Sequence, residues 1–128
     1  NYNLWGGVEE NEESLVLGLD FLGKEWLFTG DAPISIEKKI LQEFPAINCD
    51  ILKVGHHGSK TSSSYDFLKT ITPEVAIISV GRKNKYGHPN EEVIERLTSL
   101  GIPIRRTDEE GTITYETYFR AKLGRVSS

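Results

Sequence analysis

Apolar segments with strand spacing alternate with apolar segments of helical spacing through the middle of this 128-residue chain. Such alternation predicts βαβ units, in which helices connect the parallel strands of one sheet. A β-hairpin is expected before it, because residues 14–21 and 25–28 both have strand patterns and a tight connection at 22–24 separates them. The sequence therefore predicts an α/β domain with helices packed on a mixed β-sheet.

Proline, glycine and capping residues indicate where the expected elements begin and end. Ser62 to Ser64 and Asn90 are typical N-caps, and Gly101 is suited to the position after a helix. A turn at residues 108–111 should lead into the last strand. The expected strands are residues 14–21, 25–28, 50–54, 74–80, 102–106 and 112–119, and the expected helices are residues 33–44, a segment from 62–64 to 72, and residues 90–100.

The composition is typical of a soluble globular domain, with 38% hydrophobic and 27% charged residues. We expect a flexible or extended segment at residues 1–13, a domain at 14–120 and a tail at 121–128. No apolar run approaches the roughly 18 to 20 residues that cross a bilayer. The single cysteine, Cys49, excludes an internal disulfide and a thiolate cluster. The net charge of −4 argues against a broadly cationic nucleic-acid-binding surface.

Polar residues with metal-binding side chains follow three of the expected strands. Asp31 comes after the second strand, His56-His57 after the third, and His88 after the fourth. The carboxyl ends of parallel strands meet at one edge of a sheet, so these side chains could converge. Carboxylate and imidazole are ligands of hydrolytic zinc. Singly, each has a plainer explanation, since Asp31 can cap the next helix and a His pair can lie on the surface; together they favour a metal site.

Two loops beside these residues could bind an anionic substrate. Gly58, Ser59 and Lys60 offer hydrogen-bond donors where an anionic oxygen could develop. Residues 81–88 are basic with one aromatic ring, which suits a phosphodiester, although a solvated basic loop explains them equally well. A serine triad is disfavoured because no Gly-x-Ser-x-Gly elbow is present, and there is no Walker A loop.

The order of these motifs resembles the C-terminal metallo-β-lactamase-like domain of the ComEC family of competence proteins, which are bacterial membrane channels for DNA uptake. The resemblance runs from about residue 14 to residue 118. It rests on LFTGD at 27–31, LKVGHHGSKTS at 52–62, ISVG at 78–81 with YGHP at 86–89, and RTD at 106–108 before Gly111.

The resemblance implies a metal-dependent hydrolase, a nuclease domain that degrades the non-transported DNA strand with a pair of zinc or manganese ions. Asp31 resembles the carboxylate that bridges the metals, and one residue of the His56-His57 pair resembles the histidine of the second metal. We favour His56 as that ligand and expect His57 to support it or bind substrate. His88 resembles a substrate-side or acid residue. The residues expected to bind substrate are Ser59, Lys60, Arg82, Lys85 and Tyr86.

The chain departs from the family's full pattern in one respect. The upstream His-x-[His/Asp]-x-Asp-His cluster, which supplies most of the metal ligands, is not in this sequence. The chain therefore resembles the C-terminal half of the αββα sandwich, one mixed sheet with its helices. Because catalytic zinc takes three protein ligands, we expect weak metal binding or none, and no turnover, from the isolated chain.

The expected partners follow from that half-domain interpretation. A half-sandwich exposes an apolar sheet face, so we expect it to bind the missing N-terminal half of the domain or, in isolation, a second copy of itself. Single-stranded DNA is the partner implied for the parent, a cell-membrane protein, and the segment itself is not expected to contact the membrane. The alternatives are a free-standing phosphodiesterase or small-molecule hydrolase of the same fold, and a non-catalytic scaffold.

Overall fold

The computed structural model describes residues 15–115 of the chain. Their strands form one five-stranded sheet in the order β1-β2-β3-β4-β5, in which β1 is antiparallel to β2 and the other neighbours are parallel. The strands are β1 (Leu17–Phe21), β2 (Lys24–Phe28), β3 (Ile51–Lys53), β4 (Val75–Ile78) and β5 (Ile104–Arg106). The helices are α1 (Ile34–Glu43), α2 (Tyr65–Ile71), α3 (Glu91–Ser99) and α4 (Thr107–Glu110), with a 3₁₀ segment η2 (Gly55–Gly58).

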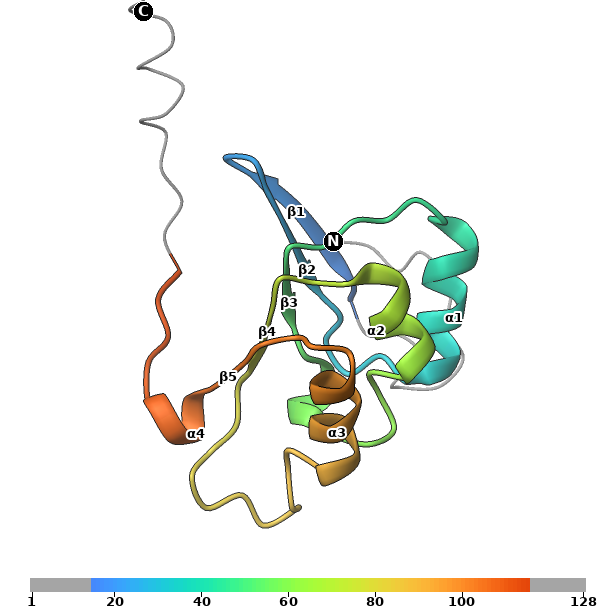
Figure 1. Ribbon diagram of the computed structural model, residues 1–128. Coiled ribbons are helices and arrows are strands. Elements are labelled where there is room, and N and C mark those ends of the chain that lie inside the picture. Colours follow the sequence, from blue (N-terminus) through green and yellow to red (C-terminus); the bar gives the residue numbers. More distant parts are fainter. Residues whose placement is uncertain (1–14, 116–128) are drawn as a thin grey trace, which may run out of the picture.

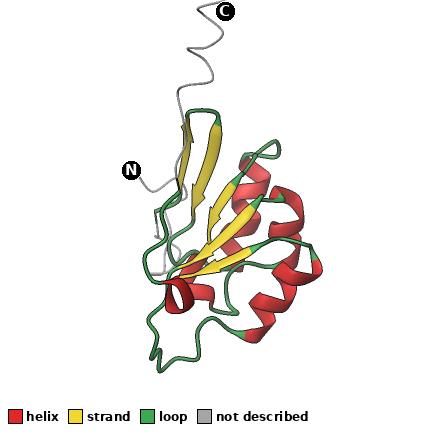
Figure 2. Ribbon diagram, turned by 60° about the vertical axis from the view of Figure 1, so that its left-hand side comes forward, coloured by secondary structure: helices red, strands yellow, loops and turns green. Residues whose placement is uncertain are grey.

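The helices α1, α2 and α3 connect the parallel strands and lie together on one face of the sheet (Figures 1 and 2). Connections between parallel strands are right-handed, so successive connections that advance in one direction place their helices on the same side. The fold class predicted from the sequence is thus confirmed. The domain has one mixed sheet with helices on one face, as in half of an αββα sandwich.

The core lies between this helical layer and the sheet. Strands β2, β3 and β4 contribute side chains from one face, whereas α1, α2 and α3 each contribute residues three or four positions apart, as expected for these two periodicities. The main contributors are Leu27, Leu52, Ala76 and Ile78 from the strands, Ile36 and Ile40 from α1, Phe67, Leu68 and Ile71 from α2, and Val93 and Leu97 from α3.

Two helix starts predicted from the sequence are formed by side-chain caps. The Ser64 hydroxyl accepts a hydrogen bond from the backbone N–H of Phe67 at 3.2 Å, and Asn90 accepts one from Glu92 at 2.9 Å. Gly101 follows α3 with a φ of 71°. Ser62 and Ser63 are not caps, because other elements bind them.

The predicted turn at residues 108–111 and strand at 112–119 are wrong within the described residues. Residues 107–110 form α4, residues 112–115 belong to no strand, and 116–119 lie outside the described residues. The Thr107 hydroxyl donates to the Val80 carbonyl at 3.0 Å and accepts from the Val80 N–H at 2.8 Å. Acidic residues in the first turn of α4 also favour a helix there, through its dipole.

The sheet face opposite the helices carries a row of exposed apolar side chains. On β1, Leu17, Leu19 and Phe21 are 43%, 44% and 51% exposed. In register with β1, Phe28 and Trp26 of β2 share this face. Their rings stack with centroids 6.1 Å apart. Among the described residues the β1 part of this face is therefore an exposed apolar surface, whereas the Tyr115 ring meets Trp26 edge to face with centroids 5.6 Å apart.

The structure does not test the predicted limits of the domain. The predicted segments 1–13 and 121–128 lie outside the described residues, so the proposed domain boundaries remain predictions. Within residues 15–115 no helix has the length and apolar character of a membrane span.

Cys49 is buried, and this burial, with the nearby charges of Asp50 and Glu25, raises the pKa of its thiol to about 12. Both effects suppress the nucleophilic thiolate, which is typical of a structural cysteine.

Candidate functional site

Three neighbouring parallel strands bring the predicted site residues to one edge of the sheet. Asp31 follows β2, the pair His56-His57 follows β3, and His88 lies in the loop after β4. The rings of His56 and His88 meet edge to face with centroids 5.9 Å apart. Residues separated by more than 50 positions in the sequence therefore gather at the carboxyl edge of the sheet, where α/β folds place their ligands.

The turn that contains Asp31 is hydrogen-bonded to the histidine loop. The backbone N–H of His56 donates to the Gly30 carbonyl at 2.9 Å, and the Ser62 hydroxyl donates to the Ala32 carbonyl at 2.8 Å. The N-cap of α1 is Pro33, with no side-chain cap, so Asp31 does not cap this helix. Its exposed carboxylate is available to a ligand.

The histidine pair has an unusual backbone conformation. His56 and His57 have φ values of 50° and 53°, in the left-handed region, and Gly58 follows with 84°. Such a conformation costs non-glycine residues about 1–3 kcal/mol each, and strain of this kind concentrates at functional sites. The loop before the pair is also tightly packed, because a Cβ at Gly55 would lie 2.7 Å from the Thr29 hydroxyl.

The His57 ring is held in one tautomer. Its Nδ1 lies 2.7 Å from the Ser79 carbonyl oxygen, which can only accept, so Nδ1 carries the proton. The lone pair is then on Nε2. Histidines that bind metals characteristically have this arrangement, in which the other ring nitrogen donates to a carbonyl. This contact orients the His57 ring as in a metal ligand, although the sequence alone favoured His56.

His88 is held beside the pair by its own loop. The side-chain oxygen of Asn84 accepts from the N–H groups of Tyr86 and His88, at 2.9 and 3.1 Å. Within the described residues the buried Nδ1 of His88 has no hydrogen-bond partner. Burial, followed by the neighbouring imidazoles of His56 and His57, lowers the pKa of His88, which favours a neutral ring near pH 7.

The predicted substrate-binding residues divide into two groups. The hydroxyl of Ser59 is buried and bonded to Thr61 at 2.9 Å, and its N–H donates to the His56 carbonyl, so Ser59 stabilises its own loop and its donors are not free for substrate. By contrast, the side chains of Lys60, Arg82, Lys85 and Tyr86 are exposed.

The donor set fits part of a metal site. Asp31 supplies an exposed carboxylate and His57 a ring nitrogen with a free lone pair. Within residues 15–115, however, no three His, Cys, Asp or Glu side chains are grouped closely enough to hold a metal ion. Further ligands would have to come from outside this described part of the chain.

Comparison with known proteins identifies the family. No family model matches the chain. ComE operon protein 3 of Bacillus subtilis is 41% identical over 120 residues, 94% of this chain, and Competence protein ComA of Neisseria gonorrhoeae is 37% identical over 109 residues, 84% of this chain. Recombination protein 2 of Haemophilus influenzae is 38% identical over 114 residues, or 89%. The chain belongs to the ComEC family.

The chain spans only a small part of these ComEC-family proteins. It covers 15% of the Bacillus protein, 16% of the Neisseria protein and 14% of the Haemophilus protein. The Neisseria relative is named as a competence protein, which agrees with the resemblance drawn from the motifs.

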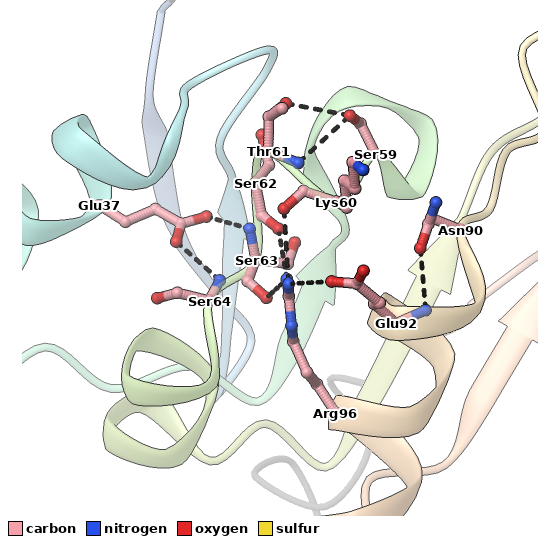
Figure 3. A network of polar contacts seen from close by, with 10 residues as sticks. All are labelled: Glu37, Ser59, Lys60, Thr61, Ser62, Ser63, Ser64, Asn90, Glu92 and Arg96. Atoms are coloured by element: carbon pink, nitrogen blue, oxygen red, sulfur yellow. Dashed lines mark hydrogen bonds and ion pairs between the residues drawn. The ribbon is translucent and has the colours of Figure 1, made fainter.

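Opposite charges from two helices hold the loop that follows the histidine pair in this ComEC-family segment (Figure 3). Glu37 of α1, 1% exposed, accepts the backbone N–H groups of Ser63 and Ser64. Arg96 of α3 donates to the carbonyls of Ser62 and Ser63 at 3.1 and 3.0 Å, and to that of Lys60 at 3.5 Å. We call Glu37 and Arg96 the loop clamp.

The sequence patterns predicted neither the loop clamp nor a role for Lys53. Glu37 lies beside Ile36 and Ile40 on the buried side of α1. A carboxylate on the apolar face of the expected helix was the sequence feature that could have indicated a buried polar contact. Lys53 interrupts an otherwise apolar strand. Burial lowers the pKa of its ammonium group and the charge of Asp31 opposes that shift, so Lys53 adds a cation near the Asp31 carboxylate.

A cavity of about 490 Å³ lies elsewhere, between the first two strands and the end of α1. It is lined mainly by apolar side chains, among them Val16, Leu27 and Ile40, and by none of the candidate site residues. The candidate site is therefore the loop edge of the sheet rather than this cavity.

Proposed function

We propose that this chain is the downstream portion of a metal-dependent hydrolase domain, which in the intact ComEC-family protein cleaves DNA during uptake. The observation that carries the proposal is the gathering of Asp31, His56, His57 and His88 at one edge of the sheet. The basic loop at residues 82–85 beside them suits a phosphodiester substrate.

Each side chain has a proposed role. Asp31 and the His56-His57 pair hold divalent metal, zinc or manganese, together with ligands from the rest of the domain. Such metals, when bound, lower the pKa of a water molecule and polarise the phosphoryl oxygen. Lys60, Arg82 and Lys85 bind phosphate oxygens, and neutral His88 exchanges a proton with the reacting group.

A scaffold role alone accounts less well for the histidine loop. Two successive non-glycine residues in the left-handed region are unfavourable, and an asparagine or glycine would satisfy the turn with less strain. The presence of two imidazoles at these positions, with the Nδ1 of His57 donating to the Ser79 carbonyl, supports a ligand role.

The test is hydrolysis of single-stranded DNA by the full-length parent protein with manganese. Asp31→Ala should lower the rate by about 100-fold or more, since loss of even residues that support a metal ligand costs 10- to 100-fold. Comparing His56→Ala with His57→Ala identifies the ligand. Asp66→Ala, at an exposed position of α2, is the matched control. Equal DNA cleavage by the parent and Asp31→Ala, or preference for a small phosphodiester over DNA, would count against the proposal.

We further propose that the open face of β1 and β2 binds the upstream half of the domain. Its exposed leucines and phenylalanine form the kind of apolar patch that drives association. Without that half, the 128-residue chain should self-associate, and Leu19→Lys should shift it towards monomer in sedimentation experiments. Lys38→Glu, on the exposed side of α1, is the control. A monomeric wild-type chain at high concentration would contradict this assignment.

A further inference from the structure

The most exposed large ring in the described structure lies beside the candidate site. Tyr86 is 74% exposed, whereas the other exposed large hydrophobic residues of this part of the chain reach at most 51%. It lies in the loop between β4 and α3, which extends from the sheet edge in Figure 1. An exposed aromatic ring offers a flat apolar face on which a ligand can stack.

The backbone orients Tyr86 rather than leaving it on an unrestrained turn. The Asn84 side chain accepts the N–H groups of Tyr86 and His88, which fixes the loop locally. The Tyr86 and His88 rings are stacked at 29°, with centroids 6.1 Å apart. His88 in turn meets His56 at 5.9 Å. Aromatic rings therefore form a row that leads from solvent to the histidine loop.

Positive charge accompanies this row. The ammonium group of Lys85 lies 6.0 Å from the Tyr86 ring centroid, and the neighbouring side chains of Arg82 and Lys83 are exposed. An aromatic face for a base, with cations for the adjoining phosphates, is the combination by which proteins bind single-stranded nucleic acid. Bases inside a duplex are paired and stacked, so their faces cannot reach such a ring.

We propose that Tyr86 stacks on an unpaired nucleobase of a DNA strand bound at the candidate site. The inference rests on the proposed function for the identity of the substrate, and it deepens that function by naming the residue that holds a base. A base on Tyr86 would place the adjoining phosphates beside Lys85, with the strand continuing past His88 towards the histidine pair.

The experiment measures binding by the 128-residue chain, with EDTA present so that cleavage plays no part. The probes are a thymidine oligonucleotide and an abasic oligomer of the same length, which has the same phosphates without bases. Tyr86→Ala should weaken thymidine binding by about fivefold or more and leave abasic binding unchanged, because stacking contributes per base. Tyr86→Phe should retain binding. Tyr65→Ala, at an exposed tyrosine of α2, is the matched control.

Salt dependence gives a second readout. Lys85→Ala should weaken both probes and reduce the slope of affinity against salt concentration, whereas Tyr86→Ala should leave that slope unchanged. Undetectable thymidine binding at millimolar concentration, or equal loss of both probes in Tyr86→Ala, would overturn the stacking role. Failure of the parent to cleave DNA would contradict the proposed hydrolase while leaving this binding result intact.

Discussion

Replacing Glu37 with alanine should lower the free energy of unfolding by about 3–5 kcal/mol. The carboxylate is buried and accepts the N–H groups of Ser63 and Ser64. Its removal leaves both donors without a partner, the Ser63 N–H in a buried position and the Ser64 N–H in a half-buried one, and each unsatisfied buried donor costs about 1–3 kcal/mol. Urea unfolding of the two proteins measures the difference.

A control on the same helix separates the loop clamp from general effects of substitution. Glu43→Ala, at the exposed end of α1, should change stability by less than about 0.5 kcal/mol. Glu37→Gln should be intermediate, because the amide offers one acceptor to two donors. If Glu37→Ala lowers the free energy of unfolding no more than Glu43→Ala does, the loop clamp does not stabilise the loop.

The loop clamp also has a pH dependence of definite sign. Burial, the largest effect, raises the pKa of Glu37 above 4.5, while the Ser64 and Ser63 N–H groups and the charge of Arg96 oppose that shift. A carboxyl group whose pKa is raised by folding contributes stability below its unfolded pKa and loses it as the pH rises through the folded pKa. The difference in free energy of unfolding between wild type and the less stable Glu37→Gln should therefore grow as the pH falls from 7 towards 4.5.

Gly58→Ala should destabilise the fold by about 2–4 kcal/mol and displace the His88 loop. A Cβ at Gly58 would lie 2.6 Å from the Cβ of Pro89 and 3.0 Å from its Cα. The position also has a φ of 84°, which alanine disfavours. The Gly58 carbonyl accepts the N–H of Asn90 at 2.8 Å, so a shift there would disturb the start of α3.

Gly87→Ala is the matched control, because Gly87 has a φ of 72° but no described atom lies within 4 Å of the position that a Cβ would occupy. It should therefore show the cost of the left-handed backbone alone, about 1 kcal/mol. Thermal unfolding measures stability, and the NMR signals of the His56 and His88 rings report their contact. Equal effects of the two substitutions would show that the packing of Gly58 on Pro89 is unimportant.

The site residues could be identified from sequence because each is tied to a local pattern. Asp31, His56-His57 and His88 each come after an apolar strand, and parallel strands bring such loops to one edge. The arrangement within the site could not be predicted in this way. That the His57 Nδ1 donates to Ser79, or that Asp31 leaves α1 uncapped, depends on atoms from different strands and loops.

Local sequence was enough to predict strands β1 to β5, helices α1 to α3 and the capping residues Ser64 and Asn90, because these depend on side chains a few positions apart. Other features exist only in the assembled fold. Thr107 bonds to Val80 and helps replace the expected turn with α4, and Glu37 is buried against amides 26 and 27 residues away. Such contacts offset the cost of burying polar groups only once the sheet and helices are assembled, so no local pattern predicts them.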